Sequence, residues 1–222
     1  MLQISTLTFL KALSKNNNKI WFDAHRNEYL DAKADFEKFV SDLLAKTAKF
    51  DSDIIGLQVK DCVFRINRDI RFSKNKTPYK NNMGASINRD GKKSIYAGYY
   101  FHLEPGGKSF VGGGIWMPES QDLKKVRQEI DYGLQEFKSI INNKAFISQY
   151  KELDNSPEEK LRNVPRGYEK DNPAAEYLKF KSLIATKYLS DEEVTNKYLS
   201  NTCIKAFKAL MPLIKFINKG LE

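Results

Sequence analysis

Apolar residues recur at helical spacing near the N-terminus. The spacing of Leu7, Leu10 and Leu13 predicts a short helix over residues 6–16, which the asparagine run at 16–18 ends. A second helical region is predicted over residues 20–49, from the apolar positions Phe36, Phe39, Val40, Leu43, Leu44 and Thr47. The chain is therefore expected to begin with helices.

The same spacing returns in the C-terminal half. Residues 119–141 carry an apolar residue at every third or fourth position, which predicts a long helix. Ser190 and Glu193 form a capping-box pattern that is typical of a helix start. The last helix is predicted over residues 201–218, and Pro212 should bend it.

The middle of the chain alternates between apolar and polar positions. Strands are predicted over residues 83–88, 94–104 and 108–117, because the turn sequences Asp90-Gly91 and Pro105-Gly106-Gly107 separate them. A short β-branched and aromatic run covers residues 63–67. Alternation in the second strand places Tyr99, Phe101 and Leu103 in the core, and it places Tyr100, His102 and Glu104 on the opposite face.

These elements predict an α+β fold, a single domain over residues 1–222 with a central antiparallel β-sheet flanked by N-terminal and C-terminal helices. No apolar run approaches the ~20 residues of a membrane-spanning helix, and residues 1–13 lack the pattern of a signal peptide. Cys62 and Cys203, the only cysteines, form no CxxC pair and are expected to be buried thiols. We therefore expect a cytoplasmic protein with no membrane partner.

The positive charge is concentrated in one part of the chain. The formal net charge is +9. Residues 60–93 contain ten basic residues against three acidic ones, which leaves +7 in this window. A local concentration of this kind favours a site that meets negative charge.

The basic segment from Arg65 to Lys80 has the equipment of an anion site. A guanidinium group matches a carboxylate or phosphate in two-point contact, and hydroxyl groups add donors. The predicted anion-binding residues are Arg68, Arg71, Ser73, Lys76, Thr77 and Lys80. In the alternative interpretation, Asp69 pairs with Arg68 or Arg71 and the lysines belong to a solvated loop.

His102 is the first candidate for proton transfer, because it shares a strand face with Tyr100 and Glu104. Tyr79 is the second candidate. The alternative for His102 is a hydrogen-bonded histidine of a sheet. Tyr100 and Trp116 are predicted pocket walls, and the run Gly112-Gly113-Gly114 predicts either a groove floor or a tightly packed sheet crossing.

Several familiar motifs are incomplete. Gly106-Gly107-Lys108-Ser109 resembles the end of a phosphate-binding P-loop, but a strand follows it, so a hairpin turn is predicted. His102-x-Glu104 lacks the Pro-Cys-x-x-Cys half of a zinc deaminase signature. Two separated cysteines and two separated histidines do not make a zinc site, whereas a carboxylate-only magnesium site stays open. No cofactor is predicted.

Five motifs together resemble one family. They are Asn16-Asn17-Asn18 with Trp21-Phe22, the segment from Arg68 to Lys80, Ala97-Gly98-Tyr99-Tyr100-x-His102, Gly113-Gly114-x-Trp116-x-Pro118, and Pro165-x-Gly167-Tyr168. They resemble the domain of unknown function 2461 family, conserved hypothetical proteins that are chiefly bacterial. The resemblance implies one domain and a cytoplasmic location, and it implies no activity or catalytic residue.

Three functions are consistent with these patterns. The first is a pocket for a small anionic ligand, which could carry phosphate and be bound with or without catalysis. The second is binding of nucleic acid, in which basic residues track phosphates while Phe64, Phe72 and Tyr79 stack on bases. The third is an interaction module that docks onto an acidic protein partner. The sequence ranks them in this order and leaves the reaction type and the oligomeric state open.

Overall fold

The structure is a computed structural model that describes all residues from 1 to 222. It has the predicted α+β architecture, a four-stranded antiparallel sheet with flanking helices. Contacts along the chain group it into two compact units. Unit 1 comprises Met1–Lys92, Tyr100–Val111 and Tyr188–Ile204, and unit 2 comprises Lys93–Tyr99, Gly112–Lys187 and Lys205–Glu222. The assignment of one domain therefore stays a prediction.

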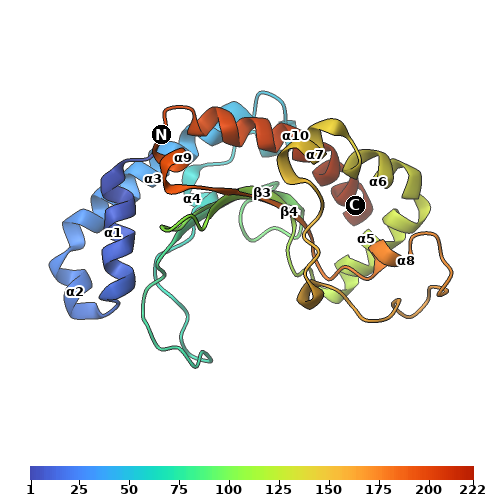
Figure 1. The fold of residues 1–222 in the computed structure, drawn as a ribbon, viewed down its shortest axis with the longest axis horizontal. Coiled ribbons are helices and arrows are strands. Elements are labelled where there is room, and N and C mark those ends of the chain that lie inside the picture. The colour runs from blue at the N-terminus through green and yellow to red at the C-terminus, as the bar shows by residue number, and fades with distance from the viewer. The chain divides into compact units, whose positions relative to one another are not determined.

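Three helices open unit 1: α1 (Ile4–Lys15), α2 (Lys19–Ala24) and α3 (Arg26–Thr47). They lie side by side in Figure 1. The asparagine run ends α1 and starts α2, because the Asn18 side chain accepts a hydrogen bond from the backbone N–H of Trp21 at 2.9 Å. The predicted helical region over 20–49 is divided at His25, which follows α2 and precedes α3.

The core of unit 1 joins α3 to the sheet. Phe36 and Phe39 lie with their ring centroids 6.1 and 4.9 Å from that of Phe101. Two short elements follow α3, the 3-10 helix η1 (Ser52–Ile54) and α4 (Val59–Cys62). Cys62 and Cys203 are both buried and form no disulfide, as predicted.

The sheet has the order β1-β2-β3-β4, with β1 (Met83–Asn88), β2 (Gly98–Leu103), β3 (Ser109–Ile115) and β4 (Leu183–Leu189). The strand predicted from residue 94 begins at Gly98. Directly before it, the buried side chain of Asn218 binds both the N–H and the C=O of Ala97, at 2.8 and 3.2 Å, so these backbone groups are bonded to a side chain and not to a strand. Residues 63–67 form isolated bridges and no strand. The strand β4 was not predicted.

The predicted alternation in β2 is confirmed. Tyr99, Phe101 and Leu103 are buried, with at most 1% of their surface exposed. The side chains of Tyr100, His102 and Glu104 are half-buried on the opposite face. We call this opposite face within unit 1 the open sheet face.

The glycines of β3 permit a close approach of the backbone of β4, its neighbour in the sheet. A Cβ atom would lie 2.2 Å from the Ala185 carbonyl oxygen if added at Gly112, and 2.0 Å from that of Leu183 if added at Gly114. These distances leave no room for a side chain. The run is therefore closely packed, which supports the packed alternative over a groove floor. The packing is between neighbouring strands of one sheet, and not at a crossing of sheets.

Unit 2 is mainly helical. The helix predicted over residues 119–141 is divided at Gly133 into α5 (Ser120–Tyr132) and α6 (Leu134–Ile141). The elements that follow are α7 (Lys144–Tyr150), the 3-10 helix η2 (Pro157–Glu159) and α8 (Ala175–Leu178). The helix α9 (Asp191–Thr195), in unit 1, begins with the predicted capping box of Ser190. The last helix, α10 (Leu199–Leu221), contains Pro212. No helix combines the length and the apolar character needed to cross a membrane.

Candidate functional site

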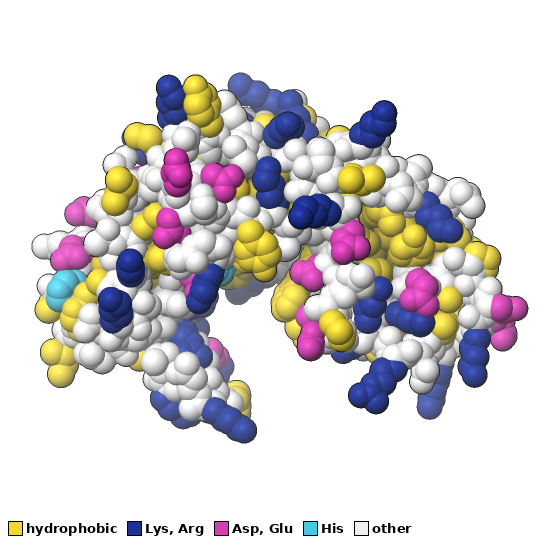
Figure 2. All heavy atoms as spheres, in the orientation of Figure 1, with side chains coloured by type: hydrophobic (Ala, Val, Ile, Leu, Met, Phe, Trp, Pro, Cys, Tyr) yellow, Lys and Arg dark blue, Asp and Glu magenta, His cyan; other side chains and the backbone are white.

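The basic segment forms a loop between α4 and β1 that extends away from the helices of unit 1 (Figure 1). Its base is closed by the antiparallel bridge between Asn67 and Tyr79. The backbone N–H of Arg68 donates to the C=O of Pro78 at 2.9 Å, and that of Lys80 donates to the C=O of Ile66 at 2.8 Å. The ends of the segment are thus held as a short ribbon. Figure 2 shows lysine and arginine side chains on the projecting part.

Arg68 bonds inside the loop. Its guanidinium group donates to the carbonyl oxygen of Thr77 at 3.2 Å, to the Thr77 hydroxyl, and to the Ser73 hydroxyl at 3.4 Å. Three of the predicted anion-binding residues are therefore brought together. In this arrangement their polar groups bond to one another and stabilise the loop.

Arg71 and Lys76 also have partners within the loop. Arg71 forms a two-point ion pair with Asp69, with nitrogen–oxygen distances of 3.0 and 2.7 Å. This pairing is the one that the alternative interpretation of the sequence predicted. The ammonium group of Lys76 donates to the carbonyl oxygen of Ile70 at 3.0 Å. Most cations of the projecting part thus serve the conformation of the loop.

Lys80 is different, because it lies at the base of the loop against the open sheet face. Its ammonium nitrogen is 5.4 Å from the centroid of the Phe64 ring. Burial, and secondarily the positive charge of Arg65, lower the pKa of Lys80. Lys80 forms no ion pair with a carboxylate. Arg65 forms none directly, although it is near enough to Asp69 for its charge to help lower the pKa of that carboxyl group. Arg65 was counted in the basic window, but it was not among the predicted site residues.

His102 connects two polar groups on the open sheet face. Its Nε2 lies 3.1 Å from a carboxylate oxygen of Glu104, and its Nδ1 lies 3.4 Å from the Tyr100 hydroxyl. In a neutral ring, donation from Nε2–H to Glu104 leaves Nδ1 as an acceptor for the Tyr100 hydroxyl. Glu104 also accepts a hydrogen bond from the Asn81 amide at 3.3 Å. The row Glu104–His102–Tyr100 can therefore hold or move a proton.

Burial sets the protonation of this row. The pKa of His102 is lowered, because the cost of burying its charged form exceeds the stabilisation from Glu104. Burial also raises the pKa of the Tyr100 hydroxyl. Near neutral pH, His102 is thus a neutral acceptor and Tyr100 a protonated donor.

Aromatic rings extend along the same face. Phe64 lies 6.4 Å from Tyr100, and Phe110 stacks on His102 at 4.7 Å with an interplanar angle of 11°. Phe110 in turn lies 5.9 Å from Tyr188, which is 67% exposed. Phe110 and Tyr188 were missed from the sequence. The alternation of β3 could have identified Phe110, whereas Tyr188 required the unpredicted strand β4.

Tyr79 and Trp116 do not join this row. Tyr79 is 7% exposed, and its ring stacks on Phe22 with a centroid distance of 3.9 Å. Asn17 binds the backbone N–H and C=O of Tyr79 at 3.0 and 2.9 Å, so this residue anchors the loop to the N-terminal helices. Trp116 belongs to unit 2 and is 61% exposed.

The glycine turn that resembles a P-loop is the predicted hairpin turn. Its backbone N–H groups at Gly106 and Gly107 donate to the carboxylate of Asp191 at 2.9 to 3.0 Å. A carboxylate of the chain itself thus occupies the small anion nest of this turn. The structure contains no cluster of three or more histidine, cysteine, aspartate or glutamate residues arranged to hold a metal ion.

Comparison with known proteins identifies the family. The family model described as conserved hypothetical protein (DUF2461) matches residues 5–216 of the 222. No curated protein and no solved structure gave a significant match. The match spans both units, the basic loop and the open sheet face, and the chain therefore belongs to the DUF2461 family of conserved hypothetical proteins.

Proposed function

We propose that the chain binds a small anionic ligand, with a phosphate as its charged group, at the base of the basic loop. The observation that carries the proposal is the pair Lys80 and Arg65. Two cations lie close enough for the charge of Arg65 to lower the pKa of the half-buried Lys80. Lys80 has no carboxylate partner, and Arg65 forms no direct ion pair, although its charge helps to lower the pKa of Asp69. A bound phosphate would offset the repulsion between them and would restore hydrogen bonds that burial removes.

The open sheet face supplies the rest of the site. Phe64 and Tyr100 form its wall beside Lys80. The protonated Tyr100 hydroxyl is a donor for an oxygen of the ligand, and His102 can accept its proton. If the protein catalyses a reaction of the bound ligand, Tyr100 and His102 are the residues that would transfer the proton. The inward-bonded cations Arg68, Arg71 and Lys76 act by shaping the loop.

A thermal-shift experiment with pyrophosphate tests the proposal. Saturation at ~100 times the dissociation constant stabilises a native protein by ~2.7 kcal/mol, which for a chain of this size raises the unfolding temperature by about 5 °C or more. Lys80→Gln and Arg65→Gln should each remove most of this rise. Lys74→Gln, at an exposed position of the loop, is the matched control and should retain it.

The alternative result is equally clear. If sodium chloride at matched ionic strength gives the same rise, or if Lys80→Gln leaves it unchanged, the site at the loop base is wrong. The pH gives a further check. Because only charged Lys80 attracts the anion, affinity should fall as the pH rises through the lowered pKa of Lys80.

The exposed aromatic row favours a second candidate, binding of single-stranded nucleic acid. Phe64 and Tyr188 are 36% and 67% exposed, and the rings of Tyr100 and Phe110 lie between them. Bases stack on aromatic rings displayed in this manner, and each stacked base contributes ~1–3 kcal/mol to the binding free energy. Fluorescence anisotropy of a labelled oligonucleotide should show binding that weakens steeply with salt and is reduced in Tyr188→Ala. Absence of binding at low salt would exclude this candidate.

A further inference from the structure

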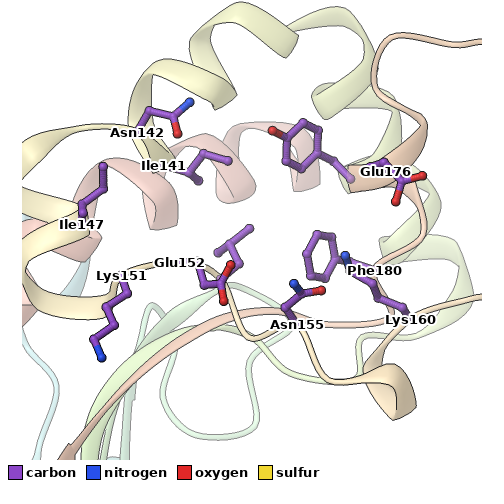
Figure 3. A pocket seen from close by; sticks show the side chains of 11 residues that line it. Ile141, Asn142, Ile147, Lys151, Glu152, Asn155, Lys160, Glu176 and Phe180 are labelled. Atoms are coloured by element: carbon purple, nitrogen blue, oxygen red, sulfur yellow. The ribbon is translucent and has the colours of Figure 1, made fainter.

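Unit 2 contains a cavity of about 250 Å³ that is separate from the proposed anion site. Its walls come from the end of α6, from α7, from residues 151–160, and from α8 with the residues after it (Figure 3). Every residue that lines the cavity belongs to unit 2. A ligand of this cavity would therefore be independent of the basic loop, the open sheet face and the function proposed above.

Part of the cavity wall is apolar, beside a comparable share of polar groups. Leu153 and Phe180 line it and are buried, with 5% and 4% of their surface exposed. Ile141, Ile147 and Tyr177 complete the apolar lining. A lining of this kind binds an aliphatic or aromatic group by removing its surface from water.

Two opposite charges share the cavity without meeting. Glu152 and Lys160 both line it, and Figure 3 shows them on opposite sides of Asn155. Neither residue forms a direct ion pair. Glu152 is exposed, and the charge of Lys160 helps to lower the pKa of Glu176, which also lines the cavity. The remaining acid, Glu176, is already paired with Lys179 at 2.6 Å. Charges of opposite sign that line one cavity without a direct ion pair between them are complementary to a molecule that carries both signs.

The wall that carries Lys160 is held rigidly. Lys160 and Phe180 form an antiparallel bridge, flanked by backbone hydrogen bonds of 2.8 and 2.9 Å from Leu161 to Lys179 and from Lys181 to Glu159. The ammonium nitrogen of Lys160 lies 4.3 Å from the centroid of the Phe180 ring. This cation–π contact keeps the charge at the edge of the apolar surface.

Glu152 is held by a strained turn. Lys151 has φ 65° and ψ −61°, and the N–H of Glu152 donates to the C=O of Tyr150 at 2.8 Å, which defines a rare γ-turn. Bonds on both sides maintain the turn, from the Tyr150 hydroxyl to Ala206 and from the N–H of Asp154 to Ile184, each at 2.8 Å. Backbone strain that surrounding contacts maintain is concentrated at functional sites.

From these observations we infer that the cavity binds a zwitterionic amino acid with an apolar side chain. Its carboxylate meets Lys160, its ammonium group meets Glu152, and its side chain lies on Leu153 and Phe180. The ligand needs both its carboxylate and its ammonium group. A molecule without the carboxylate leaves Lys160 without a partner, and a molecule without the ammonium group leaves Glu152 without one.

Titration of the protein with L-leucine, followed by NMR of the backbone amides, tests this inference. Saturable shifts are expected in residues 147–160 and 176–180. Isocaproate lacks the ammonium group, isopentylamine lacks the carboxylate and glycine lacks the side chain. Each should bind at least about tenfold more weakly than leucine, because each loses a charge-assisted contact or the apolar burial.

Variants locate the binding. Glu152→Gln and Lys160→Gln should each weaken leucine binding about tenfold. Lys144→Gln is the matched control, because Lys144 is an exposed lysine of α7 that does not line the cavity, and it should bind as the parent does. Circular dichroism confirms that each variant is folded. The inference is overturned if leucine causes no saturable shift, if isocaproate or isopentylamine binds equally well, or if the shifts lie in unit 1.

Discussion

The imidazole of His102 has a pKa that two opposing influences determine. Burial disfavours the charged ring, and Glu104 favours it through a hydrogen bond and its negative charge. Burial is the larger of the two, so the pKa lies below the ordinary 6.5. The carboxylate therefore orients the ring without charging it.

An NMR titration of the imidazole protons checks this balance. We expect a midpoint below 6.5 for His102. Glu104→Gln should lower the midpoint further, because it removes the negative charge that favours the protonated ring. The chain has only two histidines, so His25→Gln completes the assignment of the signals. A midpoint that rises in Glu104→Gln would contradict the network.

The same pKa predicts how stability depends on pH. The unfolded chain binds a proton at His102 more readily than the folded protein, so the free energy of unfolding should decrease as the pH falls through 6.5 towards the lowered folded pKa. His102→Gln should lack this part of the decrease. Urea unfolding of both proteins at several pH values measures the difference, and equal pH dependence would argue against a buried, neutral His102.

At the scale of single elements, β3 depends on glycine because carbonyl groups of β4 lie against it. Gly112→Ala places a Cβ atom 2.2 Å from the Ala185 carbonyl oxygen, and a backbone atom cannot move aside cheaply. We expect a loss of ~1–3 kcal/mol or more in the free energy of unfolding. Urea unfolding measures this loss.

Gly84→Ala is the matched comparison for Gly112→Ala. The new Cβ atom would lie 2.4 Å from the Tyr100 hydroxyl, which is the end of a side chain that can shift. Its cost should therefore be the smaller of the two. Equal losses in the two variants would show that β3 and β4 approach each other less closely than described.

At the scale of the whole molecule, the two thiols report on opening of the fold. Cys62 and Cys203 are completely buried, and burial together with the charge of Asp61 raises the pKa of Cys62 to about 11. A disulfide reagent at mildly alkaline pH should therefore label neither thiol in the native protein. Both should react once the chain is unfolded in denaturant. Rapid labelling under native conditions would contradict the burial of these residues in unit 1.

Local patterns predicted most of the helices and the alternation of β2, because helical and strand periodicities are properties of neighbouring residues. Tyr99, Phe101 and Leu103 were assigned to the core in this way. The capping box at Ser190 was equally readable, since all its bonds lie within four residues. The start of β2 and the strand β4 were predicted wrongly or missed, because residues distant in the sequence determine them. Asn218 replaces a strand at Ala97, and β4 pairs with β3 across a long connection.

The sequence by itself determined the α+β class, the position of the basic segment and the placement of His102 beside Glu104. Only the tertiary structure decided which cations of the basic segment are available to bind an anion. Arg68 and Arg71 bond inside the loop, whereas Lys80 is placed half-buried at its base without a carboxylate. The physical reason is that charge is a property of a residue, while its burial and its partner depend on how the chain closes around it.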